Sequence, residues 1–174
     1  MKQALSLIAF LIFTTSSHAQ EDFPEAERKA IAAEVEAMMS AFNNGNAEIL
    51  LEKTHPILHD LVGGKDAFEK GAIRGVKIMM ETGIKIDSLK TELPNKLYKS
   101  GGNSVCFVPV SSVMTVGDKK IASTSFMIAA KNKEGEWKYL DGTFVKTNPE
   151  QLRTFFPELP KDIDIPEVNM EQLQ

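Results

Sequence analysis

The sequence is short of cysteine. Its 174 residues include only Cys106, so the chain cannot form an internal disulfide. Cys106 lies in the apolar run Val105–Val108, where a thiol acts as a small buried hydrophobe. A nucleophilic cysteine needs a neighbouring base that stabilises its thiolate, and the sequence places no such partner. We therefore expect stability to come from packing alone, with Cys106 in the core.

Clusters of basic residues are also missing. The sequence has 20 Lys and Arg against 24 Asp and Glu, and the basic residues are scattered along the chain. Binding to the phosphates of nucleic acid requires a basic patch. The composition therefore argues against a nucleic-acid partner.

Long apolar runs are absent as well. The run Ala4–Phe13 is shorter than the roughly 20 residues that span a bilayer. It follows Lys2 and precedes Ser17-His-Ala19, which has small residues at the −3 and −1 positions of a cleavage site. We predict that residues 1–19 are a signal peptide, with a membrane anchor as the alternative. The cleaved chain would be exported without a stable membrane span. The lack of an N-x-[ST] sequon favours a bacterial periplasm over secretion outside the cell.

The first segment of the predicted mature chain has helical periodicity. Apolar residues recur at spacings of four, three and four, at Ile31, Val35, Met38 and Phe42. This pattern predicts an amphipathic helix from Glu25 to Phe42. The turn Asn43-Asn-Gly45 ends it, because glycine readily adopts the left-handed conformation of a helix C-cap.

Two histidines follow a short predicted helix that begins at the cap residue Asn46 and ends near Lys53. His55 and His59 stand at positions i and i+4, a spacing that can place two imidazoles on one metal ion when both lie on a helix. Pro56, however, is suited to the first helical position, which leaves His55 outside the helix. Since no third ligand is specified, we expect polar groups that cap a short element, and neither a metal nor a cofactor.

A third helix is predicted from Lys65 to Thr82, with Met79 on its apolar stripe. The preceding Gly63-Gly64 turn lacks the spacing of a phosphate-binding loop. Gly71 and Gly75 lie four residues apart on this helix, and each lowers helix stability by about 1 kcal/mol relative to alanine. We therefore expect another element to approach that side closely.

The rest of the chain has mainly strand periodicity. Predicted strands cover 84–93, with a break at Pro94 and a continuation over 96–99, and then 104–116, 120–130 and 137–144. Short turns at 117–119 and 133–135 make the last three strands an antiparallel meander. A short helix should follow Thr147-Asn-Pro149. Pro157, Pro160 and Pro166 then prevent regular structure, so residues 157–174 are expected to form an extended tail that packs at first and frays later.

Helices followed by a meander predict an α+β fold: a single domain over 24–156, with N-terminal helices packed on a curved antiparallel β-sheet. Both faces of the two central strands carry apolar residues. The helices can cover one face only. The other face therefore needs a cover, either the tail or a second copy of the chain.

The order of elements resembles the nuclear transport factor 2-like superfamily, a cystatin-like cone fold shared with ketosteroid isomerases, scytalone dehydratase and polyketide cyclases. The resemblance covers roughly residues 25–145. It depends on Asn43-Asn-Gly-Asn46 at the end of the first helix, Gly64-Lys-Asp-Ala-Phe68 at a helix entry, and the closing strand Gly135-Glu-Trp-Lys-Tyr-Leu-Asp141. This sequence departs from the pattern at 54–62. The strand that usually lies between the second and third helices is shortened there, and the depth of the pocket depends on that strand.

The resemblance implies a cone-shaped pocket that holds a small apolar molecule, and a homodimer formed through the sheet. Strand alternation puts Trp137, Tyr139 and Asp141 on one side of the closing strand, which offers flat apolar area and a polar anchor. We predict non-catalytic ligand binding. The candidate ligand-binding residues are Trp137, Tyr98, His55, Asp141, Phe107 and Met79.

Two other functions are open at this point. The first is a module for protein–protein interaction in the cell envelope, which dimerises through the sheet or docks on a partner through the uncovered sheet face and the proline-bearing tail. The second is an isomerase-like enzyme, in which Asp141 acts with Tyr98 or Tyr139, or His55 acts with Asp60. A closed apolar pocket with an ionisable side chain would favour the enzyme, whereas a filled cone would favour the interaction module.

Overall fold

The computed structural model describes residues 23–132, 134–143, 145 and 149–174. The predicted signal peptide, the end of the closing strand at Phe144 and the predicted cap residues Thr147 and Asn148 lie outside the described residues.

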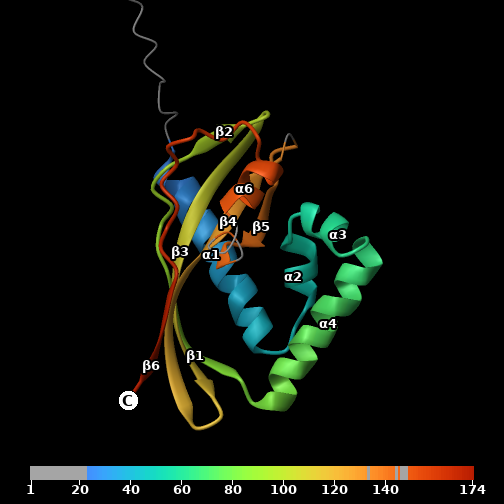
Figure 1. Ribbon diagram of the computed structural model, residues 1–174, viewed down its shortest axis with the longest axis vertical. Helices are drawn as coiled ribbons and strands as arrows, with labels where there is room; N and C mark the ends of the chain where they lie inside the picture. Colours follow the sequence, from blue (N-terminus) through green and yellow to red (C-terminus); the bar gives the residue numbers. More distant parts are fainter. Residues whose placement is uncertain (1–22, 133, 144, 146–148) are drawn as a thin grey trace, which may run out of the picture.

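The α+β prediction is confirmed: helices pack against an open, antiparallel sheet of six strands (Figure 1). The elements in chain order are α1 Glu25–Asn43, α2 Glu48–Lys53, α3 Ile57–Leu61, α4 Lys65–Thr82, β1 Lys85–Thr91, β2 Tyr98–Ser100, β3 Asn103–Val116, β4 Lys119–Lys131, β5 Trp137–Asp141, α6 Pro149–Phe155 and β6 Asn169–Leu173.

The long hairpin of β3 and β4 forms the centre of the sheet and extends beyond the helices (Figure 1). Two short strands lie along each outer edge of the hairpin. β1 and β2 both pair with β3, separated by the predicted break at Pro94, and β5 and β6 both pair with β4. The hairpin therefore has a base, flanked by β2 and β5, and a tip, flanked by β1 and β6.

Helix α1 covers one face of the base through its predicted apolar stripe. Ile31, Val35 and Met38 are buried against Cys106 and Val108 of β3. Burial raises the pKa of the Cys106 thiol to about 12, with a smaller contribution from the charge of Glu27. At this pKa the thiol is protonated at neutral pH, in agreement with its expected place in the core.

Polar contacts fix both ends of α1 to the β1–β2 edge. At the first turn, Arg28 Nε donates to the carbonyl oxygen of Pro94 at 2.8 Å. In the last turn, Asn43 accepts from the Ile86 backbone N–H at 2.8 Å and donates to the Ile86 carbonyl oxygen at 3.1 Å. Asn43 was expected only to end the helix, but it also satisfies two backbone groups of an edge strand.

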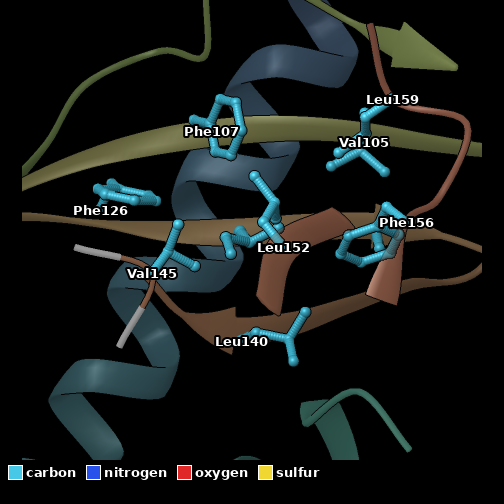
Figure 2. Close-up of a cluster of buried hydrophobic side chains, with 10 residues drawn as sticks. Val105, Phe107, Phe126, Leu140, Val145, Leu152, Phe156 and Leu159 are labelled. Carbon is cyan, nitrogen blue, oxygen red and sulfur yellow. The ribbon is translucent and has the colours of Figure 1, made fainter. Parts of the chain in front are cut away.

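The second face of the base is covered by α6 and by residues 157–168, which we call the strap. Leu152 and Phe156 at α6 and Leu159 in the strap are buried in a cluster with Phe107 and Phe126. Figure 2 shows these side chains gathered on the opposite side of the strands from α1. The tail of the same chain thus supplies the cover that the sequence requires.

The path of the strap follows from its hydrogen bonds. Near β2, Glu158 Oε2 accepts from the Gly101 N–H at 3.0 Å, and the Asp164 N–H donates to Tyr98 Oη at 3.2 Å. A few residues later, Asn169 pairs with Thr124 on the outer edge of β4. The strap therefore crosses β3 and β4. The expectation that the tail frays is wrong, because its last residues form β6.

Helix α4 has its main contacts with α2 and α3, and α2 lies between α1 and α4 (Figure 1). Its bounds match the prediction. The expected close approach at Gly71 and Gly75 is wrong: among the described residues, no atom outside the local helix backbone comes within 4 Å of a Cβ built at either position.

Gly142 is the glycine with the closest neighbours. Its N–H donates to the Phe126 carbonyl oxygen at 2.9 Å, directly after β5 ends. A Cβ at this position would overlap the Phe126 ring and its carbonyl oxygen. The Asp-Gly pair thus marks the end of β5.

Candidate functional site

The six candidate residues do not gather at one site. Trp137 and Asp141 lie on the side of the sheet that faces α1, whereas Tyr98 and Phe107 lie on the side that the strap crosses. His55 follows α2 at the edge of β5. Met79 is buried on α4, outside both core clusters.

Trp137 belongs to the packing between β5 and α1. Its Nε1 donates to Glu27 Oε1 at 3.3 Å, and the Lys131 ammonium lies 5.6 Å from its ring centroid and 2.7 Å from the same Glu27 oxygen. The indole is therefore held by a cation, a carboxylate and α1. These contacts give Trp137 a structural role.

Tyr139 lies beside Trp137 on the same side of β5 and is almost fully buried. Its hydroxyl donates to Glu34 Oε2 at 2.8 Å, and Lys53 Nζ lies 3.3 Å from that oxygen. Burial raises the pKa of Tyr139 strongly, and the hydrogen bond and negative charge of Glu34 raise it further. A phenol with a raised pKa donates a hydrogen bond but does not act as a base at neutral pH.

Asp141 is exposed at the end of β5. Its Oδ1 accepts from the backbone N–H of Thr143 at 2.8 Å, which is an Asx turn. The sheet separates Asp141 from Tyr98, so these two residues cannot form the carboxylate–phenol pair of the enzyme hypothesis. Tyr139 is directed to Glu34 instead.

His55 caps the start of α3, as the sequence predicts for a polar group in this turn. Its Nδ1 accepts from the Ile57 N–H at 3.2 Å, and its ring meets Phe156 edge-on with centroids 5.9 Å apart. Burial lowers its pKa, and the charge of His59 lowers it further. Among the described residues, no cluster of three or more His, Cys, Asp or Glu side chains could hold a metal ion.

Tyr98 and Phe107 do come together. Their ring centroids are 5.8 Å apart, and both rings line a groove of about 250 Å³. We call this the apolar groove; its other lining residues are Asn95, Lys96, Pro109, Asp164 and Pro166. Aromatic and proline side chains make up more than half of its lining residues. Lys96 Nζ and Asp164 Oδ2 form an exposed ion pair at its rim, 3.8 Å apart.

The sequence contained part of the signal for this groove. Strand alternation places Phe107 and Pro109 on the same face of β3, and Tyr98 pairs with Val105 on that face. Pro166 and Asp164 had no local signal, because they reach the groove only through the path of the strap.

A second groove of about 270 Å³ lies nearer the tip of the hairpin, across β1, β3, β4 and β6. Its lining is rich in serine and also includes Lys90 and Glu171. We call it the polar groove. The sequence carries no local signal for this groove, because serine in a strand has no distinctive pattern.

The described helices include none that is long and apolar enough to cross a membrane. No protein-family model matches this chain, and neither the curated proteins nor the solved structures contain a significant match. The two grooves on the strap side of the sheet are therefore the basis for assigning a function.

Proposed function

We propose that this chain is an exported, non-catalytic binding domain that holds a small apolar molecule in the apolar groove, within a bacterial periplasm. The observation that carries the proposal is the meeting of the Tyr98 and Phe107 rings in one groove. Flat rings with few polar groups are typical of small-molecule sites.

The size and rim of the groove favour a small ligand with one polar end. Its volume of about 250 Å³ is close to the lower limit of ligand pockets, roughly 300 Å³. Lys96 and Asp164 can each bond a polar group, since an exposed ion pair contributes only about 0–1 kcal/mol and opens readily.

The contacts of the catalytic candidates support binding without chemistry. The carboxylate of Asp141 is engaged in a turn, and His55 Nδ1 accepts a backbone hydrogen bond. An acid–base pair requires two such groups within reach of one bound molecule.

The test is native mass spectrometry of the mature protein purified from its own envelope, for which we expect a co-purified small molecule. The variant Pro109→Phe should fill the apolar groove and abolish the extra mass. Val113→Phe is the matched control, because it adds the same ring to the same face of β3 within the polar groove. A ligand that both variants retain, or an empty wild-type protein, would contradict the proposal.

A second candidate is a module that binds a partner protein through α3 and α4. Five large apolar side chains on and beside these helices are 46% to 55% exposed: Leu61, Val62, Ile73, Ile78 and Met80. Ile73 and Met80 are seven residues apart and therefore lie on the same side of α4, and exposed apolar side chains that lie together are typical of interaction surfaces. The same mass spectra would favour this function if they contained a second chain that Ile73→Ser and Met80→Ser release.

A further inference from the structure

The polar groove consists of two rows of side chains that cross four strands. Its floor comes from the two central strands, where all of the side chains that face it are small: Ser111, Val113, Ala122 and Thr124. Pairing within the sheet puts these residues on the same face as Phe107 and Phe126 of the strap-side core. The polar groove and the apolar groove therefore open on the same side of the sheet.

Side chains of the outer strands β1 and β6 form the two walls of the groove, and all of them except Ser88 are longer than those of the floor. Lys90 on β1 pairs with Ser111, and Ser88 pairs with Val113. On the other side, Asn169 on β6 pairs with Thr124, and Glu171 pairs with Ala122. The groove exists because small residues at the centre lie between long ones at the edges.

The charges at the two walls have opposite sign. Lys90 Nζ lies 3.7 Å from Glu92 Oε1, and both side chains are largely exposed, so this pair contributes little to stability. Glu171 is exposed and has no ion-pair partner among the described residues. An anionic group can therefore bind at Lys90, and a cationic group at Glu171.

The separation of these charges sets the length of a ligand. Neighbouring strands are about 4.8 Å apart, so β1 and β6 are about 14 Å apart. Lys90 and Glu171 are also offset by one row, or about 7 Å along the strands. The backbone-to-backbone diagonal is then about 16 Å, and the two long side chains shorten the gap that a ligand must bridge. An extended tripeptide of about 10 Å fits this gap.

The floor suits a peptide as well. Hydroxyl groups both donate and accept hydrogen bonds, and the groove presents Ser88, Ser111 and Thr124 together with the amide of Asn169. A peptide carries an N–H and a C=O at almost every residue, and each loses its water when it binds. Side chains that both donate and accept hydrogen bonds can replace the hydrogen bonds that the peptide made to water, along its whole length.

From this arrangement we propose that the polar groove binds a short zwitterionic peptide, with its carboxylate at Lys90 and its ammonium at Glu171. This site is separate from the apolar groove, and it can exist whether or not the apolar groove holds a ligand.

The test compares three probes by NMR titration: triglycine, acetyl-triglycine, which lacks the ammonium, and triglycinamide, which lacks the carboxylate. We expect triglycine to shift the backbone signals of residues 88–90, 111–113, 122–124 and 169–171. It should bind roughly two- to fivefold more tightly than either capped probe, because each capped probe loses one solvent-exposed charged contact.

Two variants assign the charges. Lys90→Gln should bind triglycine and triglycinamide equally, and Glu171→Gln should bind triglycine and acetyl-triglycine equally. Lys29→Gln is the matched control, because Lys29 is also an exposed lysine paired with a single glutamate, but lies on α1. It should keep both preferences. Equal binding of the three probes by the wild type, shifts outside the groove, or no shifts up to the solubility of triglycine would overturn the proposal.

Discussion

The base and the tip of the β3–β4 hairpin belong to the same two strands but differ in what covers them. At the base, Val105, Cys106, Phe107 and Val108 are all buried, because α1 lies on one face and α6 and the strap lie on the other. Toward the tip, from Ser111 to Val116, every residue of β3 is only partly buried. One pair of strands thus serves as core at one end and forms a partly exposed surface at the other.

This difference shows that the length of a strand and the burial of its side chains are set by different features. The hydrogen-bond ladder continues without a break from Ser104↔Lys131 to Val116↔Lys119. Burial stops where the covering elements stop. Polar side chains enter β3 at the same level, at Ser111, Ser112 and Thr115, where they are interspersed with apolar residues that are only partly buried.

The largest effect is expected from cutting the strap. Truncation after Phe156 removes buried Leu159 and the half-buried Ile163, Ile165 and Val168 from the core of the base. We expect the free energy of unfolding in urea to fall by about 5 kcal/mol, from the burial of one full and three partial apolar side chains. Truncation after Val168 removes only β6, all of whose residues are exposed, and should cost less than about 1 kcal/mol. Equal losses for the two truncations would refute the division into base and tip.

A smaller effect is expected from two substitutions on β4. Phe126 is buried and its ring meets that of Phe107 edge-on, with centroids 5.5 Å apart. Phe126→Ala should lower the free energy of unfolding by about 4 kcal/mol, through lost burial and the resulting cavity. Thr124→Ala, two residues away on the same face, should change it by less than about 0.5 kcal/mol. If Thr124→Ala were as costly as Phe126→Ala, the tip would be core as well.

The smallest effect concerns pH. Because the fold lowers the pKa of His55 from its ordinary value of 6.5, the unfolded chain takes up this proton first on acidification. The stability that depends on neutral His55 is complete above pH 6.5 and is lost as the pH falls through the lowered pKa. Thermal melts of His55→Asn should therefore depend less on pH below 6.5 than those of the wild type.

Asparagine is the conservative choice at position 55, because its side chain can still accept the hydrogen bond from the Ile57 N–H. The variant also loses the ring contact with Phe156, so the lost titration is measured by the change in slope of the melting temperature against pH and not by its absolute value. Parallel curves for the wild type and the variant would show that His55 does not contribute to the pH dependence.

Local signals predicted most of the secondary structure. The stripe of Ile31, Val35 and Met38 predicted α1, and the turn at Gly117 predicted the hairpin. The alternation of Trp137, Tyr139 and Leu140 was also correct, since the first two face α1 and the third faces the strap side. These features depend on residues that are neighbours in the sequence.

The candidate site was predicted less well, for a physical reason. Strand periodicity predicts which aromatic rings share a side of the sheet, but not whether that side faces a pocket or a helix. The side that carries Trp137 faces helix α1. Only two of the six candidate residues, Tyr98 and Phe107, line one groove.

The spacing of apolar residues, together with glycine and proline, was enough to locate most of the helices and strands, their turns and the side chains that share a face. Strand β6 is the exception, because it forms only by pairing with the distant strand β4. Which regions of the sheet are core and which are groove depends on the tertiary structure. That choice depends on where the strap crosses the sheet, and contacts between Tyr98 and Asp164, or Thr124 and Asn169, join residues far apart in the chain.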